Sequence, residues 1–385
     1  MPVPDATLAE HLHEQAAVRT GLTDFGGDDH YEPLAVLLQA YAAEAGLTEA
    51  GWAKITETLV QSLASRLRTE AAWREHPAHR TTPVTRPVFV TGLPRSGTTA
   101  LHRLLCADPA HQGVELWLAA APQPRPRRED WPSNPDFAAM QATIDRRNAA
   151  VPGLKGMHFM SPDAVEECWW LERQTLRSLA FPSVAHLPTY ARWLAGQDHT
   201  ATYARHRRIL QLIGTTSPER RWVLKNPGHL FSLDALLTVY PDALVVQTHR
   251  DPRSVIASVS SLTSRTSRGH SEVFTPAVVG RDSLDLWAGA TERSLAERAR
   301  HDPGRFVDVH YEEFVADPVG TVARVYAALG VPFEETARSA VVAADDVSRR
   351  GDRRPDHRYS LAEFGLSEGE VAERFSAYLA AHPAG

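Results

Sequence analysis

The chain has 385 residues, of which 43% are hydrophobic and 23% are charged, and its formal net charge is −6. This composition is typical of a globular protein, and an acidic chain is not typical of nucleic-acid-binding proteins, which are usually basic. The two cysteines, Cys106 and Cys168, do not suggest a disulfide framework. No apolar run approaches the ~20 residues of a membrane span, and the first residues lack the apolar segment of a signal peptide. We therefore expect a soluble cytoplasmic protein with no nucleic-acid partner and no membrane span.

The first 80 residues are predicted to form helices and carry no catalytic motif. Two apolar stripes recur there at helical spacing. They consist of Leu34, Leu37, Leu38 and Tyr41 in one segment, and of Ile55, Leu59, Leu63 and Leu67 in the next. A connector rich in proline and threonine follows at residues 76–87. We expect a helical N-terminal extension over residues 1–80 and an α/β domain over residues 81–385.

Residues 87–106, PVFVTGLPRSGTTALHRLLC, predict a buried strand, a glycine loop and a helix. Gly92 and Gly97 have the spacing of a P-loop, and Thr99 stands at its Ser/Thr position. The backbone N–H groups of such a loop and the positive end of the following helix dipole attract an anion. The segment therefore predicts an anion-binding loop at the end of a strand.

The cation of this loop is not where a P-loop NTPase has it. Thr98 takes the Lys position, which disfavours hydrolysis of ATP or GTP, and Arg95 supplies a cation instead. The segment from Pro94 to Thr99 resembles the 5′-phosphosulfate loop of the sulfotransferases that use 3′-phosphoadenosine 5′-phosphosulfate (PAPS). The resemblance implies that the phosphosulfate is held by Arg95, Ser96, Gly97, Thr98 and Thr99, and that Arg95 also assists the reaction.

Two further strands are predicted to end in charged side chains. Trp222 to Leu224 is followed by Lys225, and Leu244 to Thr248 is followed by His249 and Arg250. The carboxyl ends of the strands are where open α/β sheets bind their ligands. In the sulfotransferases a Lys at the first of these strand ends lies near the transferring sulfuryl group. The resemblance therefore gives Lys225 a catalytic role.

Arg250 begins a second motif. Asp251 and Pro252 are good N-cap and N1 residues and predict a helix over 252–262. Ser258 lies two turns along that helix, so its hydroxyl and Arg250 can reach one phosphate. In the sulfotransferases an Arg and a Ser at this spacing hold the 3′-phosphate of PAPS. ATP has no 3′-phosphate, and the unpartnered Arg would disfavour it by ~1–3 kcal/mol.

Three side chains are candidates for the general base, in the order Glu115, Glu167 and His158. Glu115 stands where several sulfotransferase subfamilies have a carboxylate that deprotonates the acceptor, but a solvated surface Glu is an equal alternative. Glu167 and its neighbour Glu166 belong to a strong helix predicted within residues 156–181, where the helix dipole alone also explains an acidic pair. His158 lies just upstream of that helix.

The base predicted here differs from that of the cytosolic sulfotransferases. Those members have a catalytic His close after the strand-end Lys. In this chain Pro227 stands in that region and His229 follows two residues later. The difference favours a carboxylate as the base.

The C-terminal third is less specific. Residues 261–274 are polar and predict a mobile loop or lid, and Phe306 to Val309 predicts another strand. A basic segment over 347–365 is predicted to be irregular. Within it, Arg349-Arg350-Gly351 resembles the Arg-Lys-Gly segment with which cytosolic relatives close over the 3′-phosphate, and a solvated basic loop explains it equally well.

The sequence as a whole predicts an α/β fold, in which helices flank a P-loop-type parallel sheet. The resemblance implies a sulfotransferase that moves the sulfuryl group of PAPS to a hydroxyl of a small acceptor and releases adenosine 3′,5′-bisphosphate. The aromatic and methionine-rich segments favour an apolar or aromatic acceptor. No metal is implied, because the His and Cys residues lack ligand spacing, and a homodimer is left open. A P-loop kinase or NTPase and a non-catalytic nucleotide-binding module are the alternatives.

Overall fold

The structure is a computed structural model that describes residues 6–150, 160–350 and 360–383. Within them a single parallel sheet has the strand order β2-β3-β1-β4-β5. The strands are β1 (Val88–Gly92), β2 (His111–Gln112), β3 (Arg221–Lys225), β4 (Leu244–His249) and β5 (Phe306–His310). Because β1 lies between β3 and β4, the glycine loop, Lys225 and Arg250 leave the sheet at the same edge. The predicted parallel α/β fold is confirmed.

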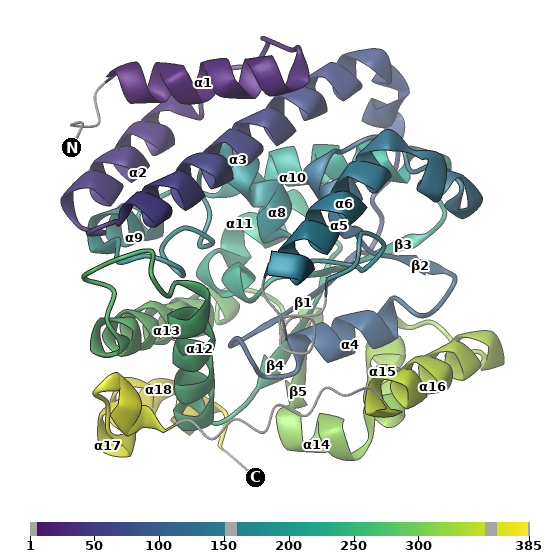
Figure 1. The fold of residues 1–385 in the computed structure, drawn as a ribbon. Helices are drawn as coiled ribbons and strands as arrows, with labels where there is room; N and C mark the ends of the chain where they lie inside the picture. The colour runs from purple at the N-terminus through teal and green to yellow at the C-terminus, as the bar shows by residue number, and fades with distance from the viewer. Residues whose placement is uncertain (1–5, 151–159, 351–359, 384–385) are drawn as a thin grey trace.

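Both faces of the sheet are covered by helices (Figure 1). Side chains alternate between the faces, with Val88 and Val90 on one and Phe89 on the other. The first face packs against α4 (Thr98–Leu105), α15 (Pro318–Leu329) and α16 (Glu335–Arg350), and the second against α10 (Thr200–Ile213) and α11 (Leu233–Val239). This two-sided burial explains why the central strands are continuous apolar runs.

A third group of helices packs at the edge of the sheet beside the glycine loop. They are α12 (Pro252–Thr266), α13 (Pro276–Arg298), α17 (Glu368–Arg374) and α18 (Ser376–Ala381). Their common core includes Leu93 of the loop. The start of α12 is as predicted, since the Asp251 side chain accepts a hydrogen bond from the Arg253 N–H and Pro252 is the first helical residue. The remaining helices of the domain are α5 (Leu116–Ala120), α6 (Pro135–Ala150), α8 (Trp169–Glu172), α9 (Pro188–Ala195) and α14 (Tyr311–Ala316).

The N-terminal region consists of α1 (Ala6–Thr20), α2 (Tyr31–Ala43) and α3 (Glu49–Glu75), which lie together in Figure 1. These helices share a buried core with residues 176–194. They also contact the segment after α12, because the Thr48 N–H donates to the His270 carbonyl at 3.1 Å. A Cβ on Gly51 would lie 1.9 Å from that same oxygen. The segment predicted as a lid is therefore partly helix α12 and partly packed on the N-terminal helices.

The strong helix predicted within residues 156–181 is wrong for the described part of that range. Only the single turn of α8 and a 3₁₀ turn at Arg173–Thr175 form there. The backbone N–H groups explain why. That of Glu166 donates to the Val114 carbonyl and that of Cys168 to the Lys225 carbonyl, so the chain is held by tertiary partners and not by its own helix.

Two smaller differences from the predicted elements concern helix α16 and strand β2. Helix α16 extends to Arg350, four residues into the predicted irregular segment, and buries Val341 against the sheet core. Strand β2 is only two residues long and has no apolar pattern that would predict it.

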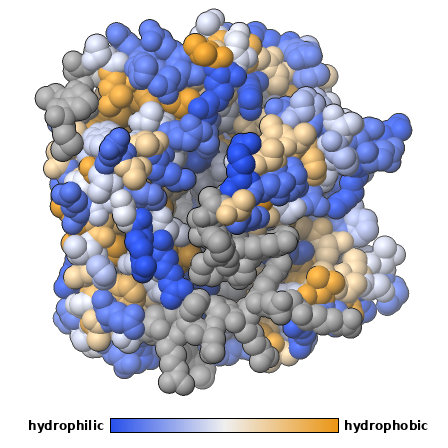
Figure 2. Space-filling view, viewed as in Figure 1, coloured by the Kyte–Doolittle hydropathy of each residue, from blue (hydrophilic) through white to orange (hydrophobic). Residues whose placement is uncertain are grey.

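None of the described helices is long and apolar enough to cross a bilayer. On the face in Figure 2, hydrophobic residues form small patches among hydrophilic ones.

Candidate active site

The glycine loop is held in a P-loop-like conformation by its own residues. Gly92, Arg95 and Gly97 have positive φ angles of 135°, 65° and 90°. A Cβ on Gly92 would lie 2.3 Å from the Thr248 carbonyl, so only glycine fits there. The buried Ser96 hydroxyl hydrogen bonds to the Leu93 carbonyl and, at 2.6 Å, to Oγ1 of Thr248. The Ser96 side chain therefore fixes the loop to β4.

Arg95, Arg250 and Ser258 meet beside this loop, although they are far apart in the sequence. Nε of Arg95 donates to the Ser258 hydroxyl at 3.3 Å, and the Arg250 guanidinium donates to the Arg95 carbonyl at 2.6 Å. The Arg250 guanidinium also lies 4.0 Å from the ring centroid of Tyr311. Arg250 and the Ser258 hydroxyl form a site that suits a second phosphate, and Arg95 links this site to the loop.

Lys225 lies on the other side of the loop. Its ammonium group donates to Oγ1 of Thr99 at 3.1 Å and forms an ion pair with Glu167. The Lys225 side chain is 3% exposed and that of Glu167 is 26% exposed. Thr98 is buried at the first position of α4, whereas Thr99 is exposed. The loop, a lysine and a partly accessible carboxylate therefore lie together.

The structure separates the two predicted carboxylate bases. Glu115 precedes α5 and accepts hydrogen bonds from Arg125 at 3.0 and 3.2 Å. Both side chains of this pair are largely buried, and Arg125 also donates to Gln112 and to the Gly113 carbonyl. Glu115 is thus part of a buried structural network, whereas Glu167 is the carboxylate that contacts Lys225.

The remaining predicted site residues are His158, Arg349, Arg350 and Gly351. His158 and Gly351 lie outside the described residues. Arg349 is on an exposed part of α16 and forms an ion pair with Asp345 at 2.8 Å. Arg350 is the last residue of the same helix.

The site also contains a buried polar cluster that sequence reasoning missed. Both oxygens of Glu172 accept hydrogen bonds from the Asn226 side-chain amide, at 3.0 and 3.1 Å. Burial, opposed by the Asn226 hydrogen bonds, raises the pKa of Glu172 to about 7. His229 donates or accepts at 2.8 Å with the Tyr203 hydroxyl, and its burial holds the pKa of His229 well below the usual value. His229 is therefore a core residue. The only sequence signal for this cluster was the position of His229 shortly after Lys225, in the segment KNPGH.

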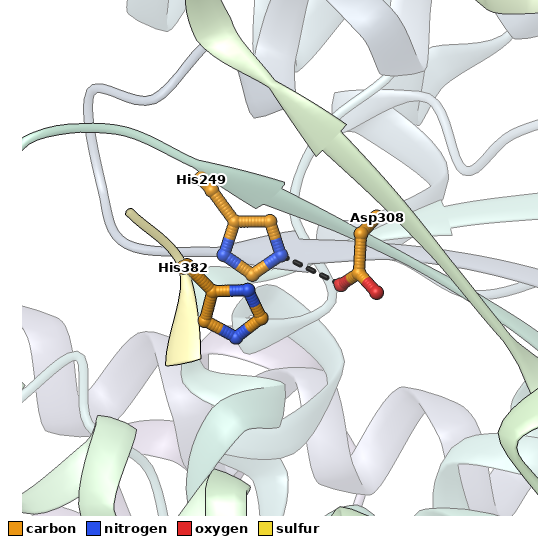
Figure 3. Close-up of side chains that lie close together, drawn as sticks. All are labelled: His249, Asp308 and His382. Carbon is orange, nitrogen blue, oxygen red and sulfur yellow. Dashed lines mark hydrogen bonds and ion pairs between the residues drawn. The ribbon is translucent and has the colours of Figure 1, made fainter. Parts of the chain in front are cut away.

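A cluster of imidazoles lies behind Arg250, where β4, β5 and the C-terminal end of α18 meet (Figure 3). His249 hydrogen bonds to Asp308 at 2.7 Å and to the Tyr378 hydroxyl at 3.1 Å, and the His382 ring stacks on it at 3.7 Å. Burial, with the nearby His249 as a smaller cause, lowers the pKa of His382 to about 4. Arg298 donates to both oxygens of Asp308. The hydrogen bonds of His249 join the end of β4, which precedes Arg250, to β5 and α18.

The sheet, the glycine loop and the converging cations define a P-loop-like nucleotide-binding α/β protein. More specifically, the chain belongs to the sulfotransferase family, whose model matches residues 87–335. Enzymes of this family use PAPS as the sulfuryl donor.

Three relatives support this assignment. The crystal structure of sulfotransferase STF1 from Mycobacterium tuberculosis H37Rv is 48% identical with a TM-score of 0.89, and the match covers 96% of this chain and 98% of that one. The structure of STF9 from Mycobacterium avium is 27% identical with a TM-score of 0.88, over 100% and 99%. The omega-hydroxy-beta-dihydromenaquinone-9 sulfotransferase Stf3 of Mycobacterium bovis is 29% identical over 257 residues, 64% of this chain. This chain spans 63% of the length of that curated relative.

Proposed function

We propose that this protein transfers the sulfuryl group of PAPS to a hydroxyl of a small apolar acceptor and releases adenosine 3′,5′-bisphosphate. One observation carries the proposal. The ammonium of Lys225 lies between the glycine loop, through Thr99, and an accessible carboxylate, Glu167. A cation between an anion-binding loop and a base is the arrangement that a sulfuryl transfer to a hydroxyl requires.

The donor would occupy the two anion sites described above. The backbone N–H groups of the loop, with Arg95, Thr98 and Thr99, hold the 5′-phosphosulfate. Arg250 and Ser258 hold the 3′-phosphate. The hydrogen bond from Arg95 to Ser258 supports the binding of one donor molecule at both sites, because it shows that the two sites are adjacent.

The reaction would use Lys225 and Glu167 together. The acceptor oxygen forms a bond to sulfur, the bond from sulfur to the bridging phosphate oxygen breaks, and the acceptor proton passes to Glu167. Negative charge grows on the leaving oxygen, where Lys225 and Arg95 stabilise it. A Glu167 that has taken the proton no longer binds the ammonium of Lys225 as an ion pair, so Lys225 becomes free to neutralise that charge.

The acceptor is proposed from the side chains next to Glu167. Trp169 and Trp170 stack at 4.6 Å between ring centroids, and the Arg173 guanidinium lies over both rings. Both tryptophans are partly exposed. Aromatic surface beside the base favours an apolar alcohol or phenol, and one relative is named for a hydroxylated menaquinone. A cytoplasmic location and a homodimer remain predictions.

Two alternatives are weaker. A P-loop kinase needs a Lys in its loop and a Mg²⁺-binding Asp at a strand end. The corresponding positions hold Thr98 and, at the end of β4, His249 and Arg250. A non-catalytic nucleotide-binding module would need no lysine–carboxylate pair beside the loop, and this chain has one.

Thermal unfolding with different nucleotides tests the donor, and conversion of PAPS tests the reaction. Adenosine 3′,5′-bisphosphate without metal, at a hundred times its dissociation constant, should stabilise the protein by ~2.7 kcal/mol. ADP and ATP should stabilise it much less. Release of adenosine 3′,5′-bisphosphate from PAPS should then increase with a long-chain primary alcohol or a phenol. Stabilisation by ATP that requires Mg²⁺, with none by the bisphosphate, would exclude the proposal and favour a kinase.

A further inference from the structure

The segment from Glu167 to Glu172 holds the end of β3 at three points. The Glu167 carboxylate binds the Lys225 ammonium, and the Cys168 N–H donates to the Lys225 carbonyl at 2.9 Å. The third point is Glu172, which accepts from the Asn226 amide. Two consecutive residues, Lys225 and Asn226, are thus each bound by a carboxylate of one short segment.

Asn226 in turn connects β3 to the strand that carries the glycine loop. Its backbone N–H donates to the Val90 carbonyl at 3.2 Å, and its carbonyl accepts from the Thr91 hydroxyl at 3.0 Å. Its side-chain oxygen accepts from the Gly228 N–H and starts the 3₁₀ turn Pro227–Phe231. That bond fixes the orientation of the amide, so its nitrogen faces both oxygens of Glu172.

We propose that Glu172 is a positioning residue for Lys225 and acts through Asn226. Its carboxylate fixes the turn after Lys225 so that the ammonium remains over Thr99 of the loop. This inference rests on the proposed sulfuryl transfer, in which Lys225 stabilises the leaving oxygen. Among the described residues, Glu172 contacts neither the glycine loop nor the Lys225 ammonium, and its side chain is only 11% exposed.

The chemistry of the pair explains why a charged carboxylate suits this position. An ionised carboxylate offers two acceptor oxygens to the Asn226 amide nitrogen, whereas a protonated one turns one of these oxygens into a donor. The structure therefore binds Asn226 most firmly when Glu172 is ionised. Burial disfavours that ionised form. A buried charge that is retained at a cost in stability is expected where it orients a functional group.

The test separates positioning from general stability. Glu172→Gln keeps the size of the side chain but removes one acceptor, and Glu172→Asp keeps the charge but shortens its reach. The matched control is Glu297→Gln, because Glu297 is another buried carboxylate that pairs with Arg293 at 2.7 Å. Conversion of PAPS to adenosine 3′,5′-bisphosphate would be measured with 4-nitrophenol and with water alone as acceptors, beside binding of the bisphosphate and urea unfolding.

We expect kcat of both Glu172 variants to fall by about 10- to 100-fold, with little change in the KM for PAPS. Glu172→Gln should be no less stable than the wild type at pH 8, and its loss of turnover should become smaller as the pH falls and Glu172 of the wild type takes up a proton. The inference is overturned if wild-type protein turns over PAPS and both variants stay within two-fold of it. It is also overturned if their turnover falls only in proportion to lost stability or bisphosphate binding. A wild type that binds the bisphosphate but converts no PAPS would instead refute the proposed function, and the inference with it.

Discussion

The two sides of the site differ in how the chain builds them. The phosphate side consists of two strand–loop–helix units, and its side chains are Arg95, Arg250 and Ser258. The base side consists of Glu167 and Glu172, on a segment with a single helical turn. Their partners are Lys225, at the end of β3, and Asn226, the next residue. The first side is fixed by local backbone geometry, and the second by long-range contacts. We therefore expect substitutions on the base side to lower turnover and substitutions on the phosphate side to weaken nucleotide binding.

The largest effect is expected on the base side, at Lys225. Lys225→Met removes the cation that stabilises the leaving oxygen, so kcat for PAPS conversion should fall by about 10²- to 10³-fold. Binding of adenosine 3′,5′-bisphosphate, measured by calorimetry, should change little. The control is Lys54→Met, on an exposed position of α3. Equal losses of turnover and of bisphosphate binding would show that Lys225 serves the phosphate side instead.

Glu172 predicts an unusual pH dependence of stability. The pKa of Glu172 rises from 4.5 to about 7 on folding, so the folded state binds more protons than the unfolded state between these values. Stability from this group therefore falls as the pH rises through that window, by up to about 3 kcal/mol. Urea unfolding of wild type and Glu172→Gln at pH 5, 6, 7 and 8 should show the variant gaining relative stability with pH. A constant difference between the two proteins would contradict this.

Arg250 is the main test of the phosphate side. Arg250→Ala should weaken binding of adenosine 3′,5′-bisphosphate by roughly 10- to 150-fold, because charge-assisted hydrogen bonds to a phosphate are lost. Binding of ADP, which has no 3′-phosphate, should change little, so that the preference for the bisphosphate disappears. The matched control is Arg253→Ala, since Arg253 is bound to Asp251 on the same helix turn. A bisphosphate preference that survives in Arg250→Ala would place the 3′-phosphate elsewhere.

The same contrast explains what the sequence predicts. Gly92, Gly97 and Asp251 have their roles because of backbone geometry within a few residues, and such geometry leaves a fixed spacing in the sequence. The loop, the strands on either side of it and the start of α12 were therefore predictable. The sequence could not select Glu167 from the three candidate bases Glu115, Glu167 and His158. The residues around Glu167 in the sequence do not indicate that Lys225 lies next to it.

The failure on the base side has a physical cause. Residues 166–172 begin with two acidic residues that suit the first turn of a helix, but the backbone N–H groups of Glu166 and Cys168 have partners on other elements. Tertiary hydrogen bonds of this kind override local propensity. The carboxylate and amide of Glu172 and Asn226 are 54 residues apart and leave no pattern in the sequence.

The smallest effect on bisphosphate binding is expected at Ser258. This substitution removes a single hydroxyl from the phosphate side and leaves Arg95 and Arg250 in place. Ser258→Ala should weaken bisphosphate binding by roughly 2- to 10-fold, because one uncharged donor is lost while the charge of Arg250 remains. Ser260 on the same helix provides the control. Its buried hydroxyl has no hydrogen-bond partner among the described residues, and we expect its removal to leave the phosphate surface unchanged. Calorimetric titration of the two variants compares them directly. If Ser258→Ala and Ser260→Ala bind the bisphosphate equally, Ser258 only packs within α12, and Arg250 alone holds the 3′-phosphate. If only Ser258→Ala binds the bisphosphate more weakly, Arg250 and Ser258 both contact the 3′-phosphate, as the spacing of the two residues in the sequence predicts.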